Sequence, residues 1–206
     1  MIRFIYFDLG NVLLFFDPDL ACRRMAEVAG VTPQEVKRAI YDSRLMEVYE
    51  LGRISSDEWY WIFCHRTRSQ PDYEKLLYAA GDMFTPNEAV WDLAKHLRRS
   101  GYRLGILSNT CDAHWRYCRR HYADGLRLFE VAALSFELGV MKPSEEIFHK
   151  AADLAGVPPA EIFFVDDRPE HVAGARQVGF DAVRYEAADQ LAEELRRRKL
   201  LGPTGE

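Results

Sequence analysis

Short runs of large apolar residues alternate along the chain with longer segments in which apolar side chains recur every three or four positions. The runs predict buried β-strands at 4–7, 102–107, 131–134, 162–165 and 182–185. The periodic segments between them predict helices, among them 87–100 and 145–155. Strands that alternate with helices form parallel βαβ units, so we expect an α/β fold with a doubly wound parallel sheet.

One long segment breaks this alternation directly after the first strand. Residues 17–86 show helical spacing throughout, and a turn at 51–58 divides them in two. We therefore expect a helical cap domain at 17–86, inserted into a core domain formed by 1–16 and 87–206. Thr85-Pro86-Asn87-Glu88 predicts the start of the next helix, with the Thr85 hydroxyl as N-cap. Residues 202–206 are expected to form a loose tail.

Composition limits the partners that the protein can have. The chain of 206 residues is 48% apolar, which suffices for one core domain and a smaller appendage. The net charge is −5, with acidic and basic residues interspersed, so we expect no nucleic-acid partner. No apolar stretch approaches the length of a membrane span, and the first apolar run is too short for a signal peptide, so we expect a cytoplasmic protein. The four cysteines form no CxxC pair and are expected to be free thiols.

Polar residues stand at the carboxyl ends of three predicted strands. Asp8 ends the first strand, Ser108 ends the second, and Asp166-Asp167 end the fourth. In an open parallel sheet, ligands bind beyond these ends, at the switch in strand order. We therefore expect the four side chains to converge in space although they are distant in sequence.

Clustered carboxylates repel one another unless a cation compensates them, and oxygen ligands of this kind suit Mg²⁺. With Mg²⁺ and a cation such as Lys142 neutralising a phosphoryl group, Asp8 can attack phosphorus and form an aspartyl-phosphate that water then hydrolyses. The Ser108 hydroxyl can hold phosphate oxygens. The pattern therefore favours phosphoryl transfer.

Four motifs of this sequence, taken together, resemble those of the haloacid dehalogenase-like hydrolase superfamily. They are DLGNV at 8–12, SN at 108–109, KP at 142–143 and FVDD at 164–167, and the resemblance covers essentially the whole chain. Their detailed form, with ELGRIS at 50–55, is similar to the bacterial α-D-glucose-1-phosphate phosphatase branch. The resemblance implies a Rossmann-like core with a helical cap inserted after the first motif.

The resemblance also implies roles for single residues. Asp8 would be nucleophile and Mg²⁺ ligand, Gly10 would offer its backbone carbonyl to the metal, and Asp166 would be the third protein ligand. Asp167 would support the site, either through a metal-bound water or by pairing with Lys142.

Ser108, Asn109 and Lys142 would bind the phosphate. The expected activity is that of a Mg²⁺-dependent phosphatase acting on a small phosphorylated metabolite, with a sugar phosphate such as glucose 1-phosphate as first guess. Two alternatives remain open: a 2-haloacid dehalogenase, and a catalytically weak module that binds phosphate or a partner.

Position 10 departs from the usual pattern of the superfamily. Most of its phosphatases carry a second aspartate two residues after the nucleophile, as general acid for the leaving group, and here that residue is Gly10. The glucose-1-phosphate branch shares this glycine, which argues against simple inactivation. A proton could come from water, from Asp17, or from a cap residue such as Glu47 or Glu50.

Other polar residues have less specific interpretations. His114, His121 and His171 lack a compact zinc-ligand pattern and are expected to be surface or core residues. Arg168 follows the paired acids, and it could reach the substrate or face solvent.

Overall fold

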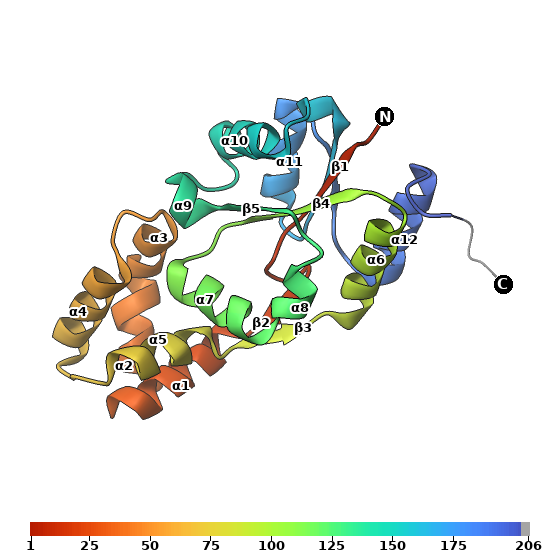
Figure 1. Cartoon of the computed structure of the whole chain (residues 1–206). Helices are drawn as coiled ribbons and strands as arrows, with labels where there is room; N and C mark the ends of the chain where they lie inside the picture. The colour runs from red at the N-terminus through yellow and green to blue at the C-terminus, as the bar shows by residue number, and fades with distance from the viewer. Residues whose placement is uncertain (203–206) are drawn as a thin grey trace.

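The computed structural model describes residues 1–202 and has a five-stranded parallel sheet at its centre (Figure 1). The strand order is β5-β4-β1-β6-β7. The strands are β1 (Phe4–Phe7), β4 (Arg103–Ser108), β5 (Val131–Leu134), β6 (Ile162–Asp166) and β7 (Asp181–Arg184). The expected α/β fold with a doubly wound sheet is confirmed.

The order of the strands reverses at β1, which lies between β4 and β6. Phe4 pairs with Arg103 on one side and with Ile162 on the other. The ladder continues one residue beyond the strand, because the backbone N–H of Asp8 donates to the carbonyl of Val165 at 2.9 Å. Asp8 therefore leaves the sheet at the switch point, the position at which open α/β sheets bind ligands.

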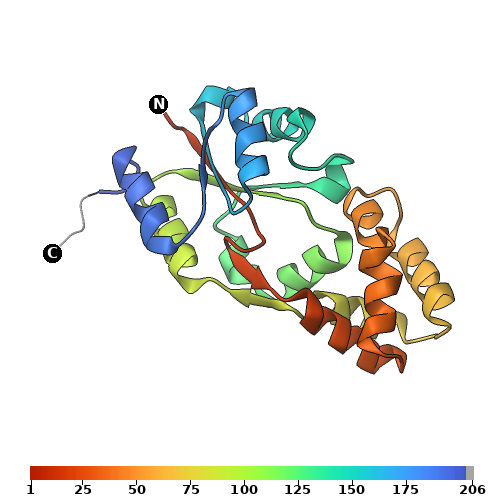
Figure 2. The same cartoon turned by 180° about the vertical axis from the view of Figure 1, so that it is seen from behind.

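Alternate residues of β1 serve two different hydrophobic cores. Phe4 and Tyr6 pack in a cluster with residues of α10 (Glu145–Ala155) and α11 (Pro169–Val178). Ile5 and Phe7 pack with residues of α6 (Glu88–Arg99), α7 (Asp112–His121), α12 (Ala188–Arg197) and the inserted helices. The period of two along a strand thus supplies both faces, which helices cover in Figures 1 and 2.

The inserted segment contains a group of helices beyond the carboxyl ends of the strands (Figure 1). They are α1 (Pro18–Ala29), α2 (Pro33–Lys37), a π-helix (Arg38–Asp42), α3 (Leu45–Glu50), α4 (Ser56–Thr67) and α5 (Tyr73–Gly81). Thr32 and Ser55 begin α2 and α4 with complete capping boxes. We propose that this group, which spans residues 18–81, is the cap domain that the sequence predicts at 17–86.

A two-stranded antiparallel ribbon joins the cap to the core, and helical periodicity alone had not predicted it. β2 (Leu14–Phe16) pairs with β3 (Phe84–Pro86), so the expectation of helices alone from 17 to 86 is wrong at its end. Thr85 lies in this ribbon and Asn87 occupies the N-cap position of α6, so the predicted Thr85 cap is wrong as well. Proline is tolerated in β3 because a ribbon has free edges.

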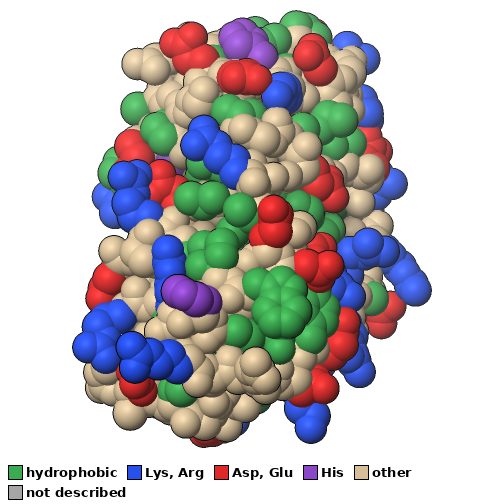
Figure 3. All heavy atoms as spheres, turned by 90° about the vertical axis from the view of Figure 1, so that its left-hand side faces the viewer, with side chains coloured by type: hydrophobic (Ala, Val, Ile, Leu, Met, Phe, Trp, Pro, Cys, Tyr) green, Lys and Arg blue, Asp and Glu red, His purple; other side chains and the backbone are tan. Residues whose placement is uncertain are grey.

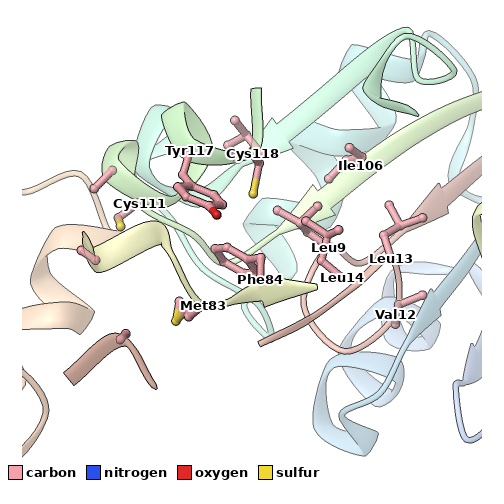
Figure 4. Close-up of a cluster of buried hydrophobic side chains, with 14 of the residues drawn as sticks. Leu9, Val12, Leu13, Leu14, Met83, Phe84, Ile106, Cys111, Tyr117 and Cys118 are labelled. Carbon is pink, nitrogen blue, oxygen red and sulfur yellow. The ribbon is translucent and has the colours of Figure 1, made fainter. Parts of the chain in front are cut away.

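The loop between Asp8 and β2 is held in place by its apolar residues. Leu9, Val12 and Leu13 are buried, and Figure 4 shows them beside residues of β3, β4 and α7. The backbone N–H of Leu14 donates to the carbonyl of Leu9 at 2.8 Å, which closes a tight turn. Gly10 lies in this turn and stays partly exposed. The apolar residues therefore fix the chain on both sides of Gly10.

The remaining described elements are short. They are α8 (Ala123–Leu126), α9 (Ser135–Leu138) and a 3₁₀ helix (Pro159–Glu161). Cys22, Cys64, Cys111 and Cys118 are all buried and free, as expected. Between residues 1 and 202, no helix has the length and apolarity that a membrane crossing requires. Figure 3 shows acidic, basic and hydrophobic side chains interspersed on one face of the molecule. Of the expected tail, residues 203–206 lie outside the described part of the chain.

Candidate active site

Three carboxylates converge at the carboxyl ends of β1 and β6. One oxygen each of Asp8, Asp166 and Asp167 lies within 4.8 Å of the others. Asp166 is fully buried and Asp8 is 7% exposed. The structure thus brings together the acidic residues that the sequence placed at these strand ends.

Lys142 lies between two of these acids. Its Nζ donates to Asp8 Oδ1 at 2.8 Å, to Asp166 Oδ2 at 2.6 Å and to the carbonyl of Leu107 at 2.9 Å. The residue is 3% exposed. The ammonium group has three protons, and these three acceptors use all of them.

Asn109 holds the main chain of Lys142 in place. Its Oδ1 accepts the backbone N–H of Lys142 at 2.8 Å, and its Nδ2 donates to the Lys142 carbonyl at 2.9 Å. The sequence predicted a phosphate-binding role for Asn109. In the structure these two bonds make its amide a clamp on Lys142. Ser108 is buried at the end of β4, and its hydroxyl makes only a long contact, 3.4 Å, with the carbonyl of Asn109. The Ser108 hydroxyl is therefore the freer donor of the two.

One ammonium group cannot fully compensate these acids. Burial opposes ionisation of Asp166, but Lys142 and then His171 outweigh it and lower the pKa of Asp166 to about 2. Burial raises the pKa of Asp8 to about 7, and the charge of Asp166 adds to the rise although Lys142 acts against it. A second cation is needed to ionise Asp8 fully beside Asp166.

His171 belongs to the site, although the sequence analysis treated it as a surface or core residue. Its Nδ1 lies 3.0 Å from Asp166 Oδ1 and 3.1 Å from Oδ2, and the residue is 4% exposed. The backbone N–H of Arg168 also donates to Asp166 Oδ1, at 2.9 Å. The position of His171 in the sequence could have indicated this contact. A histidine in the first turn of the helix that follows a strand-end acid can reach back to that acid.

Comparison with known protein families identifies the family to which this chain belongs. The profile of haloacid dehalogenase-like hydrolases matches residues 2–179. The chain belongs to this family. It is therefore a hydrolase, and the two curated relatives described next are phosphatases that it matches over nearly its whole length.

D-ribitol-5-phosphate phosphatase of Bacteroides thetaiotaomicron is 27% identical over 201 residues, which cover 95% of this chain and 97% of that protein. A sesquiterpene phosphatase of Aspergillus oryzae is 27% identical over 202 residues and 95% of each chain. The fold matches a HAD family enzyme of Bacteroides thetaiotaomicron solved with magnesium and inorganic phosphate, with a TM-score of 0.79, 24% identity, and coverage of 91% of this chain and 96% of that one. Neither curated relative is named as a glucose-1-phosphate phosphatase, so that branch is not supported.

The donor set of this hydrolase fits a magnesium ion. Carboxylate oxygens of Asp8, Asp166 and Asp167 are close enough to share one cation, and they are the hard ligands that Mg²⁺ prefers. Asn11 Nδ2 donates to Asp167 Oδ2 at 3.1 Å and so orients the third acid. The backbone carbonyl of Gly10 is the further ligand that the family motif implies.

An aromatic ring lies beside position 10 of the hydrolase, where most phosphatases of the superfamily carry their acid. A Cβ atom built on Gly10 would lie 3.0 Å from Cε1 of Phe16 on β2. Real Cβ contacts are rarely so close, so an aspartate at this position requires the ring to move. Phe16 is 39% exposed and its ring can shift toward solvent.

Proposed function

We propose that this hydrolase is a Mg²⁺-dependent phosphatase that acts on a small phosphorylated metabolite through an aspartyl-phosphate intermediate. The observation that carries the proposal is the Asp8 carboxylate at the switch point, with Lys142 bound to it and two further acids within reach. This set combines a nucleophile with cationic compensation for a transferred phosphoryl group.

The two oxygens of Asp8 have different surroundings. Oδ1 accepts the backbone N–H of Leu9 at 2.8 Å and Nζ of Lys142 at 2.8 Å. Oδ2 has no hydrogen-bond partner among residues 1–202 and is available to the metal or to phosphorus. The bonds to Oδ1 fix the orientation of the carboxylate, which reduces the entropy lost on reaching the attack geometry.

The remaining residues of the site bind or position the phosphate. The proposed metal ligands are Asp8, the Gly10 carbonyl and Asp166, with Asp167 in support; a bound Mg²⁺ would neutralise phosphoryl oxygens as a Lewis acid. Ser108 donates its hydroxyl to a phosphate oxygen, and Lys142 contributes positive charge beside the nucleophile. Asn109 acts on the phosphate through Lys142, whose main chain it holds.

The substrate is proposed only as a class. The two full-length relatives are named for a sugar-alcohol phosphate and for a sesquiterpene phosphate, which share little besides the phosphate. Glucose 1-phosphate, the first guess from the motifs, belongs at the head of a substrate panel together with ribitol 5-phosphate.

The test is phosphate release from 4-nitrophenyl phosphate with Mg²⁺ or with a chelator. We expect activity that depends on Mg²⁺ and is lost in Asp8→Asn, whereas Asp153→Asn, an exposed aspartate of α10, retains it. A phosphorylated peptide containing Asp8, trapped by acid quench and found by mass spectrometry, would identify the intermediate. Activity that persists in Asp8→Asn refutes the mechanism.

The same preparations test the two alternatives. Halide release from 2-chloropropionate without Mg²⁺ would favour a dehalogenase. Phosphate binding by calorimetry without turnover of any ester would favour a binding module.

A further inference from the structure

Glu50, the last residue of α3, is a partly buried acid of the cap without a partner for its side chain. Among residues 1–202 its carboxylate makes no hydrogen bond and no ion pair. Glu47, one turn earlier, differs in this respect, because it forms a two-point contact with Arg44, at 2.7 Å for each bond. Burying a carboxylate without a partner is costly, so the position calls for a functional explanation.

The backbone of Glu50 is attached to the core beside the phosphate-binding motif. Its carbonyl oxygen lies 2.6 Å from the hydroxyl of Ser135, at the start of α9. The same hydroxyl accepts the backbone N–H of Thr110 at 2.9 Å, two residues after Ser108. Glu50 is therefore held at the end of β4 although it belongs to the cap.

Charged and titratable neighbours place the carboxylate more closely. Its charge interacts with Arg168, which follows the end of β6, and with Cys111, which follows the end of β4. The backbone of Glu50 is thus held at the end of β4, and Arg168 follows the end of β6; β1, which ends at Asp8, lies between these two strands. The charge of Glu47, on the same helix, raises the pKa of Glu50, and the charge of Glu50 raises the pKa of Tyr41 on the π-helix.

The site needs a proton donor at this position. Gly10 has no side chain, and the adjacent space is limited by the ring of Phe16. Asp17 is engaged elsewhere, because its Oδ1 accepts the backbone N–H groups of Asp19 and Leu20 at the start of α1. Glu47 is likewise occupied by Arg44.

We propose that Glu50 is the catalytic acid that protonates the leaving oxygen, in place of the aspartate absent at Gly10. This inference rests on the proposed phosphatase function. As Asp8 bonds to phosphorus and the P–O bond to the leaving group breaks, the Glu50 carboxyl gives its proton to that oxygen and an alcohol leaves.

The second half of the reaction returns the proton. A water molecule gives a proton to the Glu50 carboxylate and attacks phosphorus, which releases the Asp8 carboxylate and inorganic phosphate. Burial, supported by the charge of Glu47 and opposed by Arg168, raises the pKa of Glu50 to about 7, so both of its forms are populated near neutral pH.

The experiment compares two esters in Glu50→Gln. For glycerol 3-phosphate, whose alkoxide is a poor leaving group, we expect kcat to fall by about 10²- to 10⁴-fold, the usual contribution of a general acid. For 4-nitrophenyl phosphate, whose leaving group needs no proton, we expect little change. We also expect the fall of the wild-type rate above about pH 7 on glycerol 3-phosphate to disappear in the variant.

Glu27→Gln, at an exposed glutamate of α1 that lies 4.0 Å from Arg24, is the control, and it should leave the ratio of the two rates unchanged. An equal loss on both esters in Glu50→Gln, or no loss on either, overturns the inference, while Asp8-dependent hydrolysis of 4-nitrophenyl phosphate then still supports the phosphatase. Wild-type protein that hydrolyses neither ester overturns both proposals. An unchanged thermal midpoint of Glu50→Gln verifies that the comparison concerns folded protein.

Discussion

Removing the ammonium group of Lys142 should destabilise the protein strongly. Lys142→Met keeps the length of the side chain but leaves Asp8 and Asp166 buried without the cation that lies 2.8 and 2.6 Å from them. Removing one partner of a buried ion pair costs about 3–5 kcal/mol, because the remaining charge is uncompensated. For a chain of this size, 1 kcal/mol corresponds to about 2–4 °C, so the midpoint should fall by about 6 to 20 °C.

The assay is thermal unfolding followed by circular dichroism, in chelator so that no metal replaces the lysine. Lys95→Met is the matched control, since Lys95 is 48% exposed and contacts Asp92 on the surface of α6. A surface pair contributes about 0–1 kcal/mol, so the control should shift by no more than about 4 °C.

The pH dependence gives an independent check. Asp166 has a lowered pKa of about 2 in the folded protein, below its ordinary value near 3.9, so its ion pair stabilises fully above about pH 4. This stabilisation is lost as the pH falls through about 2. The difference between wild type and Lys142→Met should therefore shrink below about pH 4. A Lys142→Met midpoint equal to that of Lys95→Met at pH 7 would refute the view that Lys142 compensates these acids.

Three further perturbations follow from the structure. In the Glu50→Gln background, adding Gly10→Asp and Phe16→Ala together should restore part of the lost hydrolysis of glycerol 3-phosphate, measured as phosphate release. Adding Gly10→Asp alone should restore less, because the Phe16 ring limits the space at position 10. Gly52→Ala should lower the free energy of unfolding in urea by about 1–3 kcal/mol more than Gly30→Ala. Both glycines have positive φ, but a Cβ on Gly52 would lie 2.0 Å from a backbone carbonyl oxygen of α9, whereas a Cβ on Gly30 would meet nothing. Burial lowers the pKa of His114 to about 4, so stability should fall by about 3 kcal/mol as pH drops from about 6.5 to 4; equal pH dependence in His114→Phe would contradict this.

The sequence predicts those elements whose signal is local. The strand Val131–Leu134 and the helix Glu145–Ala155 have the bounds expected from their apolar pattern and from Gly156 at the helix end. β2 and β3 escape prediction because each has three residues and each forms only by pairing with a partner about 70 positions away. Such a ribbon is specified by tertiary contacts, which single-chain periodicity does not contain.

The candidate site likewise contains some features that the sequence predicts and others that only the structure shows. Asp8 and Asp166 can be placed together from strand ends alone, because parallel strands present their carboxyl ends at one edge. The clamp that Asn109 makes on Lys142 requires the orientation of an amide and a backbone, and no residue pattern states that. The contact of His171 with Asp166 likewise depends on how far the first turn of α11 reaches back over the end of β6.

A proton donor on the cap, if Glu50 has that role, changes what controls turnover. An acid two residues after Asp8 would move with the nucleophile, whereas Glu50 reaches the site only while the loop after α3 stays docked on the core. The docking contacts are specific: Ser135 holds the Glu50 carbonyl, and Gly52 packs against the backbone of Phe136 with no room for a side chain. Loosening this loop should therefore slow the hydrolysis of esters with poor leaving groups more than that of activated esters, because proton transfer from Glu50 would require the docked cap.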